Sequence, residues 1–311
     1  GRVAGTCERM IPASNTTTRA GQTPEQVLDR VDFTVLRRLD GLLQGDYRSL
    51  IRGGGLDFTD LRNYQPQDDI RHIDWNVTAR MNTPFVRQYV EDRDLTAWFL
   101  LDRSASMAFG GDPNKAQTLT DTVVAIARLL ARDGNRIGAV LWNNRVQSVM
   151  EPRSGRNQVL RLAKHMLTPP TAAHAPTDLA SLGHAALASI RRRSLVFVIS
   201  DFVSEPSWER PLAMLARRHE VIALRIVDPA ETTLPDAGVI VMQDSETGEQ
   251  LMVDTSDVNF RDRFAQAALR REQLIADCAK RAQMDLHEIS TDDDLVRSII
   301  SMIEARTRRR R

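Results

Sequence analysis

The sequence predicts an α/β protein built on a doubly wound, mostly parallel sheet, with a small N-terminal α+β subdomain. Two strongly apolar runs, Leu95–Leu101 and Leu195–Ser200, have the length of strands that are buried on both faces. They alternate along the chain with segments of helical period, a pattern typical of a parallel sheet covered by helices. At 311 residues the chain is long enough to bury a sizeable core in one large or two modest domains.

The N-terminal part divides into two expected regions. Residues 1–22 are rich in Thr, Ser, Gly and Ala without a hydrophobic period, so we expect disorder there. Apolar residues recur at helical spacing through Pro24–Leu43, just before Gly45. Short β segments are expected at Tyr47–Arg52, Leu56–Phe58 and Phe85–Val90. Residues 24–94 are therefore predicted to form the small α+β subdomain.

From Leu95 the expected order is strand, helix, two strands, two helices, strand, helix and strand. The segments are Leu95–Leu101, Lys115–Ala131, Arg136–Trp142, Val146–Met150, Asn157–Leu167, Leu179–Arg192, Leu195–Ser200, Pro206–Arg218 and Val221–Val227. A hairpin at Asn143-Asn144 predicts one antiparallel edge in an otherwise parallel sheet. A second hairpin (Val239–Met242 with Gln250–Val253) and two helices (Asn259–Gln283 and Asp292–Arg306) complete a domain over 95–305, and 306–311 are expected to be a solvated basic tail.

Oxygen-bearing side chains follow the first of the two apolar strands. Asp102, Ser104 and Ser106 stand at i, i+2 and i+4, at the end of a strand where open α/β sheets place their ligand crevice. One carboxylate and two hydroxyls are hard ligands suited to Mg²⁺ or Mn²⁺. The same residue types are also ordinary in turns and helix caps.

Two later segments strengthen the metal interpretation. Thr177 and Asp178 lie between a Pro/His/Ala loop and a helical pattern, and Asp201 ends the second apolar strand as Asp102 ends the first. Three separate loops thus offer oxygen ligands.

These residues carry a resemblance. Asp102-x-Ser104-x-Ser106 followed by Thr177 and Asp201 resembles the metal-ion-dependent adhesion site of the von Willebrand factor A fold. The segment Gly55–Arg80 is similar to the signature that precedes this fold in a bacterial family of uncharacterised proteins, which are typically encoded beside MoxR-type AAA+ ATPases. The resemblance covers roughly Leu50 to Val227.

The resemblance implies a metal-dependent protein-binding module that is not an enzyme. Asp102, Ser104, Ser106 and Thr177 would hold Mg²⁺ (or Mn²⁺) directly or through water, Asp201 would act mainly through water, and Asp178 would stabilise its loop. An acidic residue of a partner would complete the coordination shell. The implied partner is a MoxR-type AAA+ ATPase or one of its client proteins.

Composition and charge argue against several other classes of protein. With 42 basic and 41 acidic residues the net charge is +1, so no global field favours nucleic acid, and the basic tail lacks interleaved aromatic residues for base stacking. Cys7 and Cys278 lie far apart, which favours a reducing cytoplasm over a disulfide scaffold. No apolar run reaches the length of a membrane span. We therefore expect a cytoplasmic location.

Two alternatives stay open beside the binding module. A metal-activated water could hydrolyse a phosphoester or peptide, although no general base can be assigned and the nucleophile-elbow and P-loop motifs are absent. A metal-free interaction scaffold is the other alternative. The Arg/Asp-rich segment 60–80 is expected to dock the subdomain on the sheet, with Trp75 packed at the junction, and a partner surface is the competing interpretation.

Overall fold

The structure is a computed structural model that describes most of the chain from residue 10 onwards. The described residues are 10–12, 22–43, 60–65, 73, 75–81, 83–88, 95–108, 114–170, 177–244 and 249–309.

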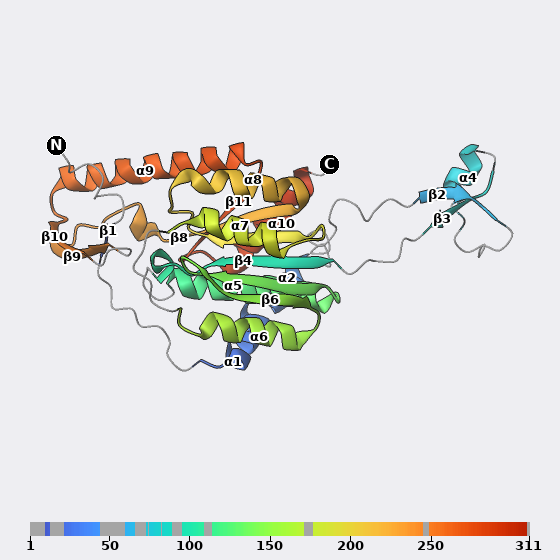
Figure 1. Cartoon of the computed structure of the whole chain (residues 1–311), viewed down its shortest axis with the longest axis horizontal. Helices are drawn as coiled ribbons and strands as arrows, with labels where there is room; N and C mark the ends of the chain where they lie inside the picture. The colour runs from blue at the N-terminus through green and yellow to red at the C-terminus, as the bar shows by residue number, and fades with distance from the viewer. Residues whose placement is uncertain are drawn as a thin grey trace.

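A six-stranded sheet forms the centre of the molecule, in the order β11-β8-β7-β4-β5-β6 (Figure 1). Its strands are β4 (Thr96–Asp102), β5 (Arg136–Trp142), β6 (Val146–Arg153), β7 (Leu195–Ser200), β8 (Glu220–Val227) and β11 (Asp285–Ser290). Neighbours from β11 to β5 pair in parallel, and β6 pairs with β5 antiparallel at the edge. The predicted fold class, a mostly parallel doubly wound sheet like that of the von Willebrand factor A fold, is confirmed.

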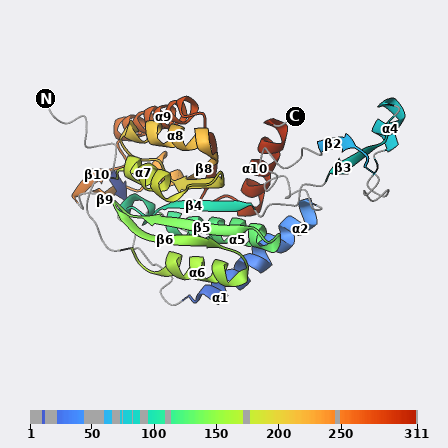
Figure 2. The same ribbon diagram turned by 45° about the vertical axis from the view of Figure 1, so that its right-hand side comes forward.

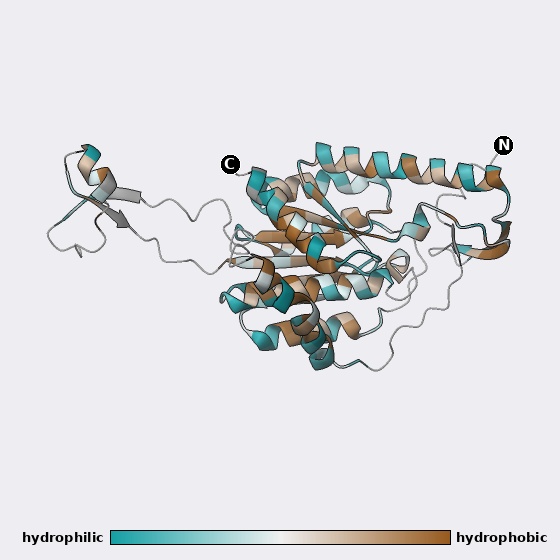
Figure 3. Ribbon diagram, turned by 180° about the vertical axis from the view of Figure 1, so that it is seen from behind, coloured by the Kyte–Doolittle hydropathy of each residue, from teal (hydrophilic) through white to brown (hydrophobic). Residues whose placement is uncertain are grey.

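Helices cover both faces of this sheet, so each central strand is buried on two sides (Figures 1 and 2). One face is covered by α1 (Pro24–Val31), the π-helical turn η1 (Asp32–Leu36), α2 (Arg37–Leu43), α5 (Lys115–Arg132), α6 (Arg156–Leu167) and α10 (Leu295–Arg309). The other face is covered by α7 (Leu179–Ser189), α8 (Glu209–Arg218) and α9 (Val258–Arg281). Alternate residues of β4 enter opposite cores: Phe99 packs under the first set of helices and Leu100 under the second. The hydrophobic strands stand out between these layers in Figure 3.

The first helical segment belongs to this core by its packing. Thr23 caps α1 in a capping box with Gln26. Val27, Leu28 and other apolar residues of α1 to α2 join the core beneath α5 and α6. Arg30 also donates to both carboxylate oxygens of Asp121 on α5, at 2.5 and 2.7 Å. The domain boundary at residue 94 stays a prediction, but the helical part of the expected subdomain packs on the α/β domain.

The remaining N-terminal elements are small. β2 (Asp60–Asn63) pairs antiparallel with β3 (Phe85–Gln88), and α4 (Trp75–Met81) lies between them in the chain. The side chain of Trp75 is 69% exposed, so its expected packing at a junction is wrong. The β segments expected at 47–52 and 56–58 lie outside the described residues.

A separate three-stranded sheet contains β1 (Met10–Pro12), β9 (Val239–Asp244) and β10 (Gln250–Asp254). The expectation of disorder throughout 1–22 is therefore wrong for residues 10–12, because they pair with β9. The predicted hairpin of β9 and β10 is confirmed.

Two features near the C-terminus differ from expectation. The edge strand β11 was not predicted, because polar Asp285, His287 and Glu288 mask its pattern. Arg306 was expected in a solvated tail, but α10 continues to Arg309 and the Arg306 guanidinium is 5% exposed and paired with Glu220. Every helix in the described part of the chain is too short or too polar to cross a bilayer.

Candidate metal centre

The sheet topology places Asp102 and Asp201 side by side. β4 and β7 are parallel neighbours, Asp102 is the last residue of β4, and Asp201 directly follows β7. Because parallel strands present their carboxyl ends at one edge, the two following loops meet there. Both carboxylates are buried, Asp102 at 0% and Asp201 at 1% exposed.

The carboxylate of Asp102 accepts hydrogen bonds from Ser104 and Ser200. The backbone N–H of Ser104 donates to its Oδ1 at 2.9 Å, and the hydroxyl of Ser200 donates to its Oδ2 at 2.6 Å. Burial and then the charge of Asp201 raise the pKa of this carboxyl to about 6, while its hydrogen bonds oppose the shift. Although Asp102 stands at the end of a strand, its side chain does not face solvent.

Ser104 and Ser106 bring their hydroxyls together beside the two carboxylates. Their Oγ atoms lie 3.1 Å apart, and the short helix η3 (Ala105–Ala108) turns the chain between them. The Ser106 hydroxyl also hydrogen-bonds to Asp201 and helps to lower the pKa of that carboxyl. The structure thus places both predicted serines in contact with each other or with a predicted aspartate.

Thr177 is tied to the same region by a contact with the loop that follows β7. Ser204, three residues after Asp201, donates its hydroxyl to the Thr177 carbonyl at 2.7 Å. Thr177 is 4% exposed. Asp178 caps α7 by accepting from the backbone N–H of Ala180 at 3.1 Å, which agrees with a role in stabilising this loop.

A buried lysine that the sequence did not single out pairs with one of the site carboxylates. The ammonium of Lys115, the first residue of α5, is 2.8 Å from Asp201 Oδ2 and 2.5 Å from Glu231 Oε1. Lys115 is 0% exposed, and the Glu231 side chain, at the end of η5 (Pro229–Glu231), is 11% exposed. Asp201 therefore already has one internal cationic partner.

The charges in this cluster set the protonation of its members. Burial alone would lower the pKa of the Lys115 ammonium, but Asp201 and Glu231 raise it above its ordinary value. Burial alone would raise the pKa of Asp201, but Lys115 lowers it below its ordinary value. Lys115 and Asp201 are thus held as an ion pair, whereas Asp102 lacks such compensation.

The backbone at Asp201 is fixed from two sides. Arg225 on β8 donates from Nε to the Asp201 carbonyl at 3.1 Å, and its other nitrogens bind Glu272 and Glu288. Phe202 has φ 58°, a left-handed conformation that costs a bulky residue roughly 1–3 kcal/mol. Its ring is fully buried and packs edge-on against Trp208 with centroids 5.2 Å apart. This packing holds the turn that directs the Asp201 side chain.

One sequence signal could have revealed Lys115. Its helix is strongly apolar, and Asn114 caps it in a capping box with Gln117. A cation in the first turn opposes the helix dipole, so a lysine at this position needs a compensating carboxylate nearby. The identity of that carboxylate could not be found from spacing, because Asp201 and Glu231 lie 86 and 116 residues further along the chain.

The donor set fits a hard divalent cation. Asp201 and Glu231 bring two carboxylates to the Lys115 ammonium, and Asp102 adds a carboxylate without a cationic partner among the described residues. The hydroxyls of Ser104 and Ser106 add uncharged oxygen donors. Within the described residues no three His, Cys, Asp or Glu side chains converge as a metal site, so a cation here depends on serine and threonine oxygens. Oxygen donors of this kind suit Mg²⁺ or Mn²⁺.

The chain matches the family described as "Protein of unknown function DUF58" over residues 60–274. This span includes every residue of the candidate site. The chain belongs to this family. The DUF58 protein is 36% identical over 285 residues to the uncharacterised protein Rv1480 of Mycobacterium tuberculosis, with 90% of this chain and 89% of that protein covered. It is also 36% identical over 157 residues to the uncharacterised protein MAV169 of Mycobacterium avium, covering 50% of this chain and 92% of that one.

Two solved structures align with most of this chain at low sequence identity. The protein BatB from Bacteroides thetaiotaomicron aligns with TM-score 0.45 and 13% identity, covering 69% of this chain and 99% of that one. An aerotolerance-related membrane protein from Bacteroides fragilis aligns with TM-score 0.44 and 15% identity, covering 68% and 99%. The fold assignment of the DUF58 protein rests on its own strand order and pairing.

Proposed function

We propose that this DUF58 protein is a non-enzymatic, divalent-metal-dependent protein-binding module. Asp102, Ser104, Ser106 and Thr177 would hold Mg²⁺ (or Mn²⁺), and Asp201 would act through water. The observation that carries the proposal is the gathering of buried carboxylates and hydroxyls at the carboxyl ends of β4 and β7. Mg²⁺ usually retains several waters, so one position can pass to a carboxylate of a partner.

The ion pair of Lys115 supports the indirect role of Asp201. One oxygen of that carboxylate already accepts from the ammonium at 2.8 Å, and the other accepts from the backbone N–H of Val203 at 3.0 Å. Direct coordination would compete with both contacts. Asp102 lacks a cationic partner and is the stronger candidate for a direct ligand.

The proposed partner is a MoxR-type AAA+ ATPase or a client protein that it remodels. This part of the proposal rests on the resemblance of the Gly55–Arg80 signature and of the metal-site residues. The five site side chains are at most 5% exposed, so a partner carboxylate reaches the metal only when the surrounding loops open. A metal-dependent partner should therefore bind with a slow, conformationally limited on-rate.

A metal-dependent hydrolase is the second candidate, favoured by the raised pKa of Asp102. A carboxyl that titrates at about 6 suits general acid–base work near neutral pH. A carboxylate that coordinates the metal is, however, no longer free to accept a proton. Turnover of p-nitrophenyl phosphate or a casein substrate by the Mg²⁺-loaded protein would favour the hydrolase.

Isothermal titration with Mg²⁺ and Mn²⁺ tests the proposal directly. Wild type should bind one ion, and Ser104→Ala should weaken binding at least tenfold, while Ser301→Ala on the exposed face of α10 serves as a matched control. Pull-down of a MoxR-type ATPase should then require both the ion and Ser104. If wild type binds no divalent ion, the metal-free scaffold replaces the proposal.

A further inference from the structure

A hollow lies at the opposite end of the sheet from the candidate metal centre. It has a volume of about 640 Å³, and β4, β5, β6 and the end of α7 contribute its walls. Thr96 and Arg136 are the first residues of β4 and β5, and Ser194 directly precedes β7. Asp102 ends β4 six residues after Thr96, which separates the two sites by about 20 Å.

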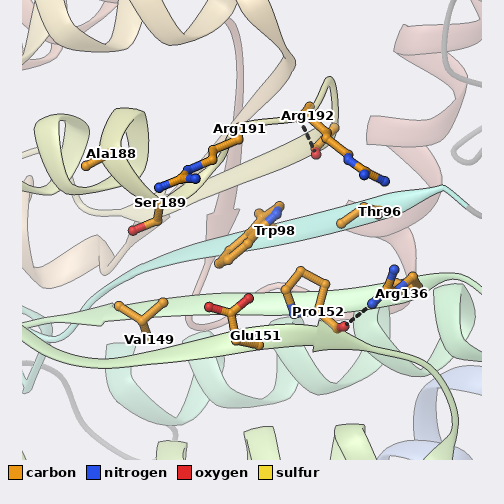
Figure 4. A pocket seen from close by; sticks show the side chains of 11 residues that line it. Thr96, Trp98, Arg136, Val149, Glu151, Pro152, Ala188, Ser189, Arg191 and Arg192 are labelled. Carbon is orange, nitrogen blue, oxygen red and sulfur yellow. Dashed lines mark hydrogen bonds between the residues drawn. The ribbon is translucent and has the colours of Figure 1, made fainter.

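The floor of this hollow is a fixed indole. Trp98 is 4% exposed and packs against β5 where Gly138 leaves room for its ring. A Cβ on Gly138 would lie 2.9 Å from Trp98 Cε3 and 3.0 Å from Pro152 Cγ. Figure 4 shows Trp98 between Arg191 and Arg192 on one side and Pro152 on the other. The floor is thus apolar and held in place by packing.

The rim of the hollow is cationic. Arg136, Arg191 and Arg192 line the hollow, yet none of them forms an ion pair within the part of the chain that the structure describes. Arg136 donates to the Pro152 carbonyl at 3.0 Å. Arginines elsewhere on the domain are matched, such as Arg128 with Asp32 and Arg132 with Asp40. Three guanidinium groups around one hollow, none with an ion pair among the described residues, suit an anionic ligand.

Glu151 limits which kind of anionic ligand can bind in the hollow. It lines the wall opposite Arg191, and Figure 4 shows its carboxylate on the same side of Trp98 as Val149. A carboxylate there repels a compact, multiply charged anion such as phosphate, but accepts from an amide N–H. A guanidinium fork pairs well with a carboxylate. The exposed Val149, at 42%, leaves the hollow open along β6, so an extended chain can enter.

We propose that this hollow binds a short acidic peptide segment of a partner protein. Carboxylates of the segment would pair with Arg191, Arg192 and Arg136, its backbone N–H groups would donate to Glu151, and an apolar side chain would rest on Trp98. This contact is independent of the metal centre, so it gives a partner a second, metal-free point of attachment.

Fluorescence anisotropy with a fluorescein-labelled Glu-Leu-Glu-Leu-Glu peptide tests the proposal on the full chain. The buffer is stripped of divalent ions on a chelating resin, because a dissolved polycarboxylate chelator would itself compete for the arginines. The double variant Arg191→Gln with Arg192→Gln should weaken binding about tenfold or more. The matched control, Arg217→Gln with Arg218→Gln on the exposed face of α8, removes the same charge and should stay within about twofold of wild type.

Three results would overturn the proposal. The Gln-Leu-Gln-Leu-Gln peptide could bind as tightly as the acidic one, which would show that the peptide carboxylates are not recognised. The two double variants could lose equal affinity, which would reduce the effect to net charge. Inorganic phosphate or citrate at low millimolar concentration could displace the peptide fully, which would make the ligand a small anion. Binding that persists in Asp102→Asn supports the proposal even if the metal centre itself proves wrong.

Discussion

Replacing Asp102 by Asn should stabilise the metal-free protein although Asp102 belongs to the proposed site. The carboxylate is fully buried beside Asp201, and no cation contacts it in the described part of the chain. Asn keeps an acceptor for the Ser104 N–H, and its amide can donate to the Ser200 hydroxyl after that hydroxyl rotates. The substitution therefore removes the repulsion and spares most of the hydrogen bonding.

The magnitude follows from the pKa of Asp102. A rise from 3.8 to about 6 corresponds to roughly 3 kcal/mol of destabilisation by the charged form, at about 1.4 kcal/mol per unit. Because the pKa of Asp102 is raised in the folded state, the charged carboxylate lowers the free energy of unfolding. This penalty is complete above about pH 6 and disappears as the pH falls below about 4. With an unfolding entropy of about 2.1 cal/mol/K per residue, the full penalty equals about 5 °C in Tm.

Thermal unfolding of wild type and Asp102→Asn in resin-stripped buffer at pH 8 and pH 4 measures this difference. The variant should unfold higher at pH 8 and close to wild type at pH 4. Asp201→Asn is the matched control, and it should lower stability by about 3 kcal/mol, because it breaks the buried pair with Lys115. Millimolar Mg²⁺ should raise Tm for wild type and leave Asp102→Asn unchanged.

A lower Tm for Asp102→Asn than for wild type at pH 8 would refute this reasoning. It would mean that the hydrogen bonds from Ser200 and Ser104 outweigh the uncompensated charge. Equal shifts for Asp102→Asn and Asp201→Asn would show that Lys115 neutralises both carboxylates alike.

Three further predictions concern stability. Lys115→Met should cost about 3–5 kcal/mol in urea unfolding, since it leaves two carboxylates without their buried cation, and a loss below 1 kcal/mol would contradict the ion pair. Burial and the charge of Arg306 lower the pKa of His287, so stability should fall as pH drops below about 6.5, and His287→Gln should flatten that slope in denaturation curves. Deleting 307–311 should leave Tm within about 1 °C, whereas deletion from Arg306 onward should lower it further, because Arg306 is buried against Glu220.

The sequence predicted the fold through local patterns. The apolar runs ending at Leu101 and Ser200 are strands β4 and β7, and the helix from Lys115 and the strand Arg136–Trp142 appear almost as expected. These elements were predictable because a strand buried on both faces is apolar along its whole length. β11 lies at the edge of the sheet, where one side faces solvent, and its polar residues concealed it.

Only part of the candidate site could be predicted from such local patterns. Asp102 and Asp201 stand at ends of predictable strands, so the topology alone brought them together. The different environments of the two aspartates depend on tertiary contacts. Lys115 reaches Asp201 and Glu231 across 86 and 116 residues, and the packing of Phe202 on Trp208 holds the turn that follows Asp201. Residue types and strand ends are local properties of a chain, but burial and pairing of a charge depend on which distant segments close over it. The sequence by itself thus determined which oxygens meet at the sheet edge, and the tertiary structure decided which of the two carboxylates keeps an uncompensated charge.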